Sequence, residues 1–145
     1  MNLYPHQVEA LEATKDLNRV GYFLDMGLGK TFVGSEKMVS FSCKVNLILC
    51  QKSKVQDWVD HFKTNYNFQV YDLTIPKEFR NFLGVSQGGK YSCVGVINYE
   101  LAWRRKDLLL LTDFTLMLDE SSYICNKSAK RTKFILKLKP QNVIL

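Results

Sequence analysis

Residues 23–31 read FLDMGLGKT, and this stretch sets the starting point for any account of the chain. Its last three residues form the ending of a phosphate-binding loop, although Leu24 stands where the pattern G-x-x-x-x-G-K-[ST] begins with glycine. Such a loop joins a strand to a helix whose first N–H groups attract an anion. Gly27 and Gly29 supply the freedom that the backbone needs beside a phosphate. The stretch predicts a nucleotide loop, with Lys30 on the β- and γ-phosphates and the Thr31 hydroxyl on Mg²⁺.

Short apolar runs alternate with amphipathic stretches on both sides of this loop. The predicted strands are 20–25, 45–50, 68–73, 92–97, 114–118 and 142–145. The predicted helices are 5–18, 30–40, 54–66, 77–82, 99–111 and 128–138. Strands separated by helices are joined by crossover connections, so we predict an α/β fold with a mostly parallel sheet between helices.

Composition fits one ordinary globular domain of 145 residues, with 46% apolar and 23% charged residues, and excludes a disordered chain. A net charge of +6 suits a polyanionic partner such as nucleic acid, but solubility alone would explain it equally well. The sequence shows neither a signal peptide nor an apolar run of the ~18 residues needed for a membrane span. We therefore expect a cytoplasmic protein without membrane contact. The cysteines follow no C-x-x-C pattern, which indicates free thiols in a reducing compartment; they are Cys43, Cys50, Cys93 and Cys125.

An acidic pair follows the predicted strand 114–118, as a metal-dependent phosphate loop requires. Asp119 is suited to hold Mg²⁺ through water, and Glu120 to orient or deprotonate the attacking water. A guanine-specific site is disfavoured, because Ala129 in the stretch NKSA lacks the carboxylate that would accept from the base.

Together these motifs resemble the amino-terminal ATPase lobe of superfamily 2 helicases and translocases, in particular the Snf2-like group and its phage relatives. In that group the loop typically reads D-E-M-G-L-G-K-T, which also lacks the first glycine of the general phosphate-loop pattern. Residues 26–31 match this family loop at every position. The resemblance implies a three-layer α/β/α RecA-like P-loop NTPase lobe and a DNA-dependent ATPase that uses ATP and Mg²⁺. Residues 3–7 resemble the Q-motif L-R-P-Y-Q, so Gln7 would pair with adenine. The implied nucleotide contacts are Gln7, Met26, Gly27, Leu28, Gly29, Lys30 and Thr31.

Three further stretches extend the resemblance over nearly the whole chain. Residues 47–62 resemble motif Ia, residues 96–101 resemble motif Ib, and residues 119–126 resemble motif II, D-E-A-H-x-I-K-N, with Ser122 and Cys125 replacing His and Lys. By carry-over the catalytic residues are Lys30, Asp119 and Glu120, and the metal ligands are Thr31 and Asp119. The implied DNA contacts are Lys52, Ser53, Lys54, Asn98, Arg104 and Arg105. Trp58 is expected in the core.

The family continues beyond motif II into motif III and a second RecA-like lobe that carries an arginine finger. We therefore expect residues 1–145 to be an incomplete helicase ATP-binding lobe, completed by a longer chain or by a partner. Such a fragment would bind ATP–Mg²⁺ weakly and hydrolyse it slowly or not at all unaided. The implied partner is double-stranded DNA. The implied localisation is the cytosol of a bacterium or of a phage-infected host cell. Two alternatives remain: a non-catalytic single-lobe nucleotide or DNA-binding module, and a P-loop fold without a nucleic-acid role.

Overall fold

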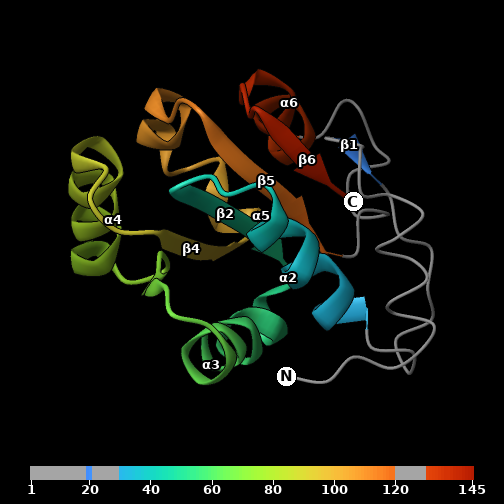
Figure 1. Cartoon of the computed structure of the whole chain (residues 1–145). Coiled ribbons are helices and arrows are strands. Elements are labelled where there is room, and N and C mark those ends of the chain that lie inside the picture. Colours follow the sequence, from blue (N-terminus) through green and yellow to red (C-terminus); the bar gives the residue numbers. More distant parts are fainter. Residues whose placement is uncertain (1–18, 21–29, 120–129) are drawn as a thin grey trace.

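The computed structural model describes residues 19–20, 30–119 and 130–145 (Figure 1). In this part of the chain a six-stranded sheet has the order β1-β6-β5-β2-β4-β3. Every neighbouring pair of strands is parallel, which confirms the predicted sheet. The strands are β1 (Arg19–Val20), β2 (Val45–Cys50), β3 (Gln69–Asp72), β4 (Cys93–Asn98), β5 (Phe114–Leu118) and β6 (Asn142–Ile144).

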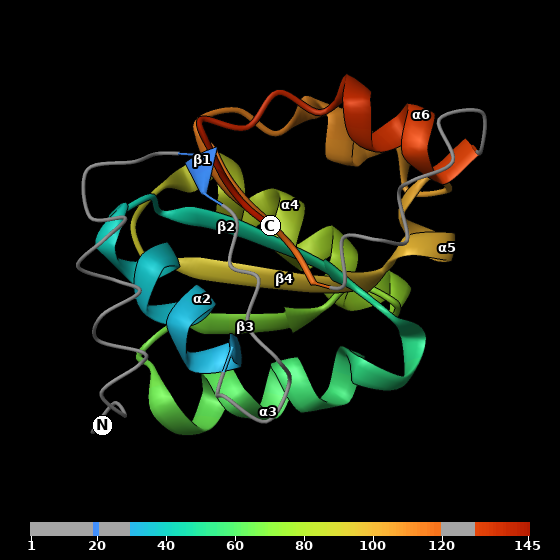
Figure 2. The same cartoon turned by 90° about the vertical axis from the view of Figure 1, so that its right-hand side faces the viewer.

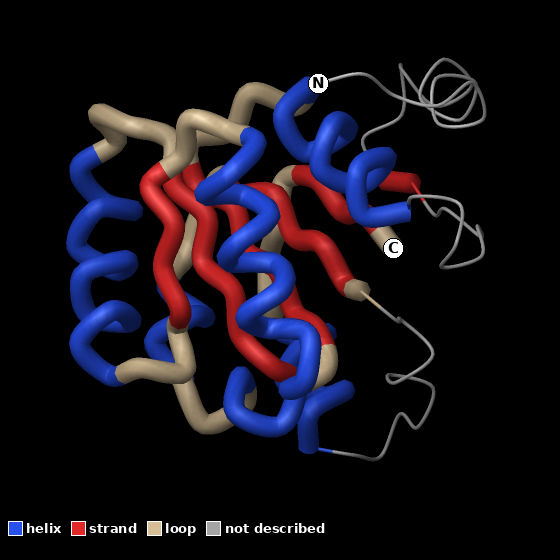
Figure 3. Tube along the Cα trace, turned by 90° about the horizontal axis from the view of Figure 1, so that it is seen from below, coloured by secondary structure: helices blue, strands red, loops and turns tan. Residues whose placement is uncertain are grey.

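Helices cover both faces of the sheet, so the domain has three layers (Figures 1 and 2). One face carries α2 (Lys30–Ser40) and α3 (Val55–Asn65), which is preceded by the 3₁₀ turn η2 (Lys52–Lys54). The elements on the other face are α4 (Pro76–Gly88), α5 (Tyr99–Ala102), the 3₁₀ turn η3 (Lys106–Leu110) and α6 (Lys130–Lys137). Figure 3 shows the strands side by side between these helices. None of the helices in the described ranges is long and apolar enough to cross a membrane.

Each central strand contributes to two hydrophobic cores, because successive side chains of a strand point to opposite faces. In β2, Leu47 and Leu49 pack with α4 and α6, whereas Ile48 and Cys50 pack with α2 and α3. All six residues of β2 are buried, and so are all six of β4. This double burial explains why both strands are continuous apolar runs rather than alternating ones.

Most predicted elements within the described residues are confirmed. The helix 30–40 and the strands 45–50 and 114–118 have the predicted bounds, and most of the others differ by one or two residues. Of the predicted first strand, the described part is β1 alone. The predicted helix 5–18 and the phosphate loop itself lie outside the described residues.

The predicted short helix 77–82 is wrong in length, because α4 continues to Gly88. Its first residue is Pro76, which favours a helix start, and it ends where Gly89 takes a left-handed conformation with φ of 63°. The sequence 84–88, GVSQG, has weak intrinsic helix propensity. Val85 nevertheless packs against the core, and this burial extends the helix beyond the predicted end.

The predicted helix 99–111 is wrong as a single element, because α5 and η3 are separate. Arg105, between them, has φ of −94° and ψ of 68°, which is not helical. Its guanidinium donates to two carbonyl oxygens that follow β3, from Nε to Leu73 at 3.4 Å and from Nη2 to Thr74 at 3.2 Å. This tertiary contact interrupts the helix that the local pattern favours.

Because all the strands are parallel, their carboxyl ends lie along one edge of the sheet, here called the carboxyl edge. In open α/β sheets, ligands bind outside the carboxyl ends of the strands. Polar residues stand at or directly after these ends in four strands: Gln51 after β2, Asp72 in β3, Asn98 in β4 and Asp119 after β5.

Candidate functional site

The second turn of α2 is in close contact with β5 at a glycine. A Cβ atom built on Gly34 would lie 2.8 Å from Met117 Sδ, closer than side chains normally approach. Because α2 connects two parallel strands, it runs antiparallel to them and begins at the carboxyl edge. Lys30 precedes Gly34 by four residues, about 6 Å along a helix, and Asp119 follows Met117 by two residues, about 6.6 Å along a strand. Lys30 and Asp119 therefore both lie on the carboxyl-edge side of the contact between Gly34 and Met117.

Asp119 is half-buried and is held by three different elements. Its N–H donates to the Leu49 carbonyl of β2 at 2.9 Å, and its own carbonyl accepts from the Tyr99 hydroxyl of α5 at 2.5 Å. Its carboxylate oxygen Oδ2 accepts from the Trp58 indole Nε1–H of α3 at 2.9 Å. These bonds fix both the backbone and the side chain of Asp119 at the end of β5.

The Asp119 carboxylate has the chemistry that Mg²⁺ requires. Mg²⁺ in nucleotide sites usually takes one or two protein carboxylates, water and the phosphates of the substrate. One carboxylate can accept several hydrogen bonds, so the Trp58 bond leaves acceptor capacity for a cation. Within the described ranges no group of three or more His, Cys, Asp and Glu side chains could hold a metal on its own. The residues present fit a Mg²⁺ that is shared with a nucleotide rather than caged by protein.

Cys50 lies beneath this edge and is kept as a neutral thiol. Burial raises the pKa of the Cys50 thiol to about 12, and the negative charges of Asp119, Asp72 and Asp57 add to the effect. Its thiol donates to the Ile97 carbonyl oxygen, at 3.9 Å from Sγ. Because a thiolate is the reactive and metal-binding form, Cys50 has a packing role at the carboxyl edge.

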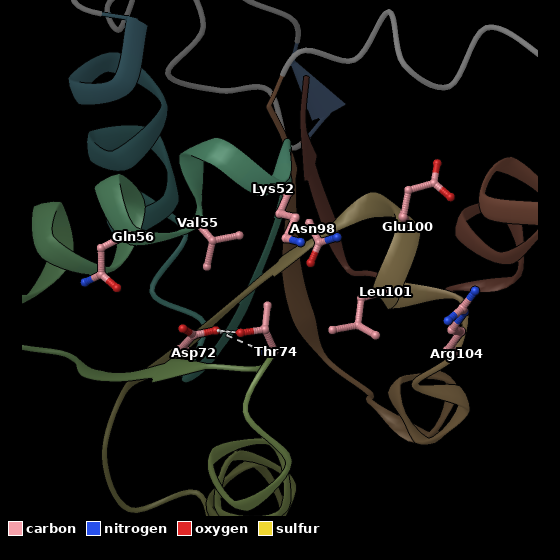
Figure 4. A pocket seen from close by; sticks show the side chains of 9 residues that line it. All are labelled: Lys52, Val55, Gln56, Asp72, Thr74, Asn98, Glu100, Leu101 and Arg104. Carbon is pink, nitrogen blue, oxygen red and sulfur yellow. Dashed lines mark hydrogen bonds between the residues drawn. The ribbon is translucent and has the colours of Figure 1, made fainter.

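A groove runs along the carboxyl ends of β2, β4 and β3, and is here called the rim groove; Figure 4 shows one of its two cavities. It consists of two cavities of about 480 and 650 Å³, which share Lys52, Asn98 and Glu100. Its lining residues are Cys50, Gln51, Lys52, Ser53, Val55, Gln56, Asp72, Thr74, Asn98, Tyr99, Glu100, Leu101 and Arg104.

The charges in the rim groove are mixed, but both carboxylates already have partners. Asp72 Oδ1 accepts from the Thr74 backbone N–H at 3.0 Å and from its hydroxyl at 2.5 Å (Figure 4). Glu100 forms an ion pair with Arg131 of α6. The positive charges of Lys52 and Arg104 belong to exposed side chains. Glu100 is thus paired with a cation, whereas Asp72 keeps its negative charge. Lys52 and Arg104 are the side chains of the groove that can meet an anion such as a phosphate.

The predicted DNA contacts divide into two groups in the structure. Lys52, Ser53, Asn98 and Arg104 line the rim groove together. Lys54 and Arg105 are not among the lining residues. The Arg105 guanidinium binds backbone carbonyls and lies 5.5 Å from the centroid of the Phe79 ring, so its visible role is structural.

Other predicted site residues lie outside the described residues: Gln7, Met26, Gly27, Leu28, Gly29 and Glu120. The backbones of Lys30 and Thr31 begin α2. Trp58 is buried with 5% exposure, as expected, but its bond to Asp119 was not predicted, because the partners are 61 residues apart in the chain. Asp72 and Thr74 were missed as well, although their place at the end of β3 and just after it is a signal for the carboxyl edge.

Comparison with known proteins gives a match in structure rather than in sequence. No protein-family model matches the chain, and no curated protein matches it. A solved structure of the Sulfolobus solfataricus SWI2/SNF2 ATPase core in complex with double-stranded DNA superimposes with a TM-score of 0.80 at 20% sequence identity. The match covers 99% of this chain and 31% of that chain. The chain therefore has the fold of a RecA-like lobe of the SWI2/SNF2 ATPase type.

Proposed function

We propose that the chain is the ATP-binding front lobe of a Snf2-like DNA-dependent ATPase, which holds ATP–Mg²⁺ at the start of α2 and a DNA backbone in the rim groove. The observation that carries the proposal is the contact between Gly34 and Met117. Since α2 begins and β5 ends on the carboxyl-edge side of this contact, it supports a common site for Lys30 and Asp119. A triphosphate bound there would meet the motif residues from both sides. The likeness in fold to a SWI2/SNF2 ATPase core supports the same proposal.

In this proposal each motif residue has one task at the nucleotide. Residues 26–31 surround the phosphates, with Lys30 on the β- and γ-phosphates, and Gln7 pairs with adenine. Thr31 and Asp119 hold Mg²⁺, which neutralises the charge that develops on the transferred phosphoryl group. Glu120 orients the attacking water or takes its proton.

The rim groove is the proposed contact with double-stranded DNA. Lys52 and Arg104 would pair with phosphates, and Ser53 and Asn98 would donate hydrogen bonds to them. Lys54 would add a charge next to the groove. Contacts of this kind fix the position of a duplex and carry no sequence information, as a motor that moves along DNA requires.

Lys30→Ala tests the nucleotide site. We expect the wild type to bind ATP in the presence of Mg²⁺ and the variant to lose measurable binding, because the charge on the β- and γ-phosphates is removed. The measurement is isothermal titration of ATP into the full chain. Lys63→Ala is the matched control, since it removes the same charge from an exposed position in α3. Unchanged ATP affinity of Lys30→Ala would show that the site is misplaced.

A second candidate is a non-catalytic module that binds nucleotide or DNA without turnover. Phosphate release from ATP in the presence of duplex DNA distinguishes the two. Arginine fingers contribute about 10³–10⁵ in rate, and we expect one only from a second lobe, so this chain alone should turn over well below about 1 s⁻¹. Adding the second lobe in trans should raise the rate of an ATPase lobe and leave that of a module unchanged.

A further inference from the structure

The contact between Trp58 and Asp119 joins two motifs that the proposed function treats separately. An indole Nε1–H can only donate, so the direction of this 2.9 Å hydrogen bond is fixed. Bonds from a neutral donor to a carboxylate are charge-assisted and stronger than bonds between neutral groups. Of the hydrogen bonds described for Asp119, this one alone engages its carboxylate.

Trp58 is itself held rigidly in α3. Its ring is buried and stacks on Phe62 at 6.1 Å between centroids and 25° between planes. The His61 ring meets it edge-on at 5.8 Å and 87°. This packing restrains the indole, so that its N–H offers the Asp119 carboxylate a donor in a fixed position.

Within the described residues, the other partners of Asp119 contact its backbone. Leu49 and Tyr99 bind only backbone atoms of Asp119. They fix the end of β5 but not the torsion that turns the side chain. A carboxylate that must meet a cation beside the start of α2 needs a partner that sets this torsion.

We propose that Trp58 is a positioning residue, whose indole N–H orients the Asp119 carboxylate toward a nucleotide-bound Mg²⁺. This inference rests on the proposed function, since it takes Asp119 as a metal ligand. Partners that orient a ligand from outside the metal's own shell typically contribute about 10–100-fold to metal affinity. Trp58 would not touch the metal or the nucleotide.

Trp58→Phe tests the inference, because it removes the N–H and keeps an aromatic ring in the core. The Mg²⁺ affinity of the ATP-bound chain should fall about 10-fold or more, while ATP affinity measured in EDTA stays as in the wild type. Loss of core packing alone would not produce this split. Equal Mg²⁺ affinity in both proteins would overturn the inference. Failure of the wild type to bind ATP–Mg²⁺ would instead remove the proposed function, and the inference with it.

A second measurement keeps Trp58 in place and so does not depend on the folding of Trp58→Phe. The chain has two tryptophans, Trp58 and Trp103, so Trp103→Phe leaves Trp58 as the single emitter. Adding Mg²⁺ to this variant in saturating ATP should change the Trp58 emission, because the acceptor of its N–H takes on a cation. A second substitution in the same protein, Asp119→Asn, should remove this Mg²⁺-dependent change in emission. The inference would be contradicted if Mg²⁺ left the Trp58 emission unchanged, or if Mg²⁺ still changed that emission after Asp119→Asn.

Discussion

His61 occupies a half-buried place among aromatic rings, next to the elements that carry the proposed site. The Phe32 ring meets it edge-on at a centroid distance of 4.7 Å, and the Tyr66 ring lies at 5.6 Å. Its Nε2 shares a 2.8 Å hydrogen bond with Ser35 Oγ of α2. Burial lowers the pKa of His61 below its ordinary value of 6.5. The imidazole is therefore neutral in the native protein near pH 7, and it links α3 to α2.

This lowered pKa predicts that the protein loses stability in mild acid. Below about pH 6.5 the unfolded chain protonates this histidine while native His61 stays neutral, so the unfolded state binds more protons. The free energy of unfolding then falls as the pH falls. We expect a lower urea midpoint at pH 5.5 than at pH 7.5, and a smaller difference in His61→Gln. If the urea midpoint of His61→Gln fell between pH 7.5 and pH 5.5 by as much as that of the wild type, His61 would not be the responsible group.

Strands and helices differ in how far the sequence predicts them. Strands buried on both faces are continuous apolar runs, and β2 and β5 have the predicted bounds. The predicted helix 99–111 is interrupted at Arg105, because its guanidinium binds backbone carbonyls on another segment of the chain. Asp119 could be placed at a strand end from local pattern alone. Its bond to Trp58 could not, because that contact exists only once the folded chain brings α3 and the end of β5, 61 residues apart, to the same edge of the sheet.

Gly95 in β4 shows how tightly α4 packs on the sheet. A Cβ at this position would lie 2.7 Å from Leu73 Cδ1 and 3.0 Å from Phe82 Cε1, and both side chains are fully buried. Neither has free space into which to move. A methyl group here must therefore displace the helix or strain the rotamers.

Gly95→Ala should lower the free energy of unfolding by about 1–3 kcal/mol, as expected for overpacking of a core. Gly84→Ala is the matched control, because Gly84 is a helical residue with open space around its Cβ position. Alanine should stabilise that helix by about 0.5–1 kcal/mol. Urea denaturation of the three proteins gives the comparison. A Gly95→Ala protein as stable as the wild type would mean that α4 is packed more loosely than described.

The whole domain combines a basic charge balance with a groove at one edge of its sheet. The net charge of +6 alone did not distinguish a nucleic-acid partner from simple solubility. Lys52 and Arg104 line the rim groove, where Glu100 is paired with Arg131 and Asp72 is hydrogen-bonded to Thr74, so the groove is the proposed location of such a contact. The chain spans 31% of the SWI2/SNF2 core that it resembles, so how a motor of two lobes would use this groove stays a proposal.

Positive charge in the groove (Lys52) and next to it (Lys54) should contribute more to DNA affinity than positive charge elsewhere on the surface. Lysines that neutralise phosphates release counterions, and the slope of log K against log salt changes by about 0.9 for each such contact. The double variant Lys52→Ala, Lys54→Ala should therefore bind duplex DNA more weakly, with a salt slope reduced by about 2. The control Lys63→Ala, Lys139→Ala removes the same charge from exposed positions away from the groove. The measurement is fluorescence anisotropy of labelled duplex DNA over a salt series. Equal DNA affinities and equal salt slopes for the two double variants would contradict the proposal.

The turn at Gly89 closes α4 at the end of the domain opposite the carboxyl edge. Its carbonyl accepts from Lys44 Nζ, and Lys90 after it is exposed. A Cβ at Gly88 or Gly89 would meet no neighbour within 4 Å. A biotin-acceptor peptide inserted between Gly89 and Lys90 would thus tether the domain to a coated slide with its groove facing the buffer. Single molecules could then be watched on stretched DNA in one known orientation.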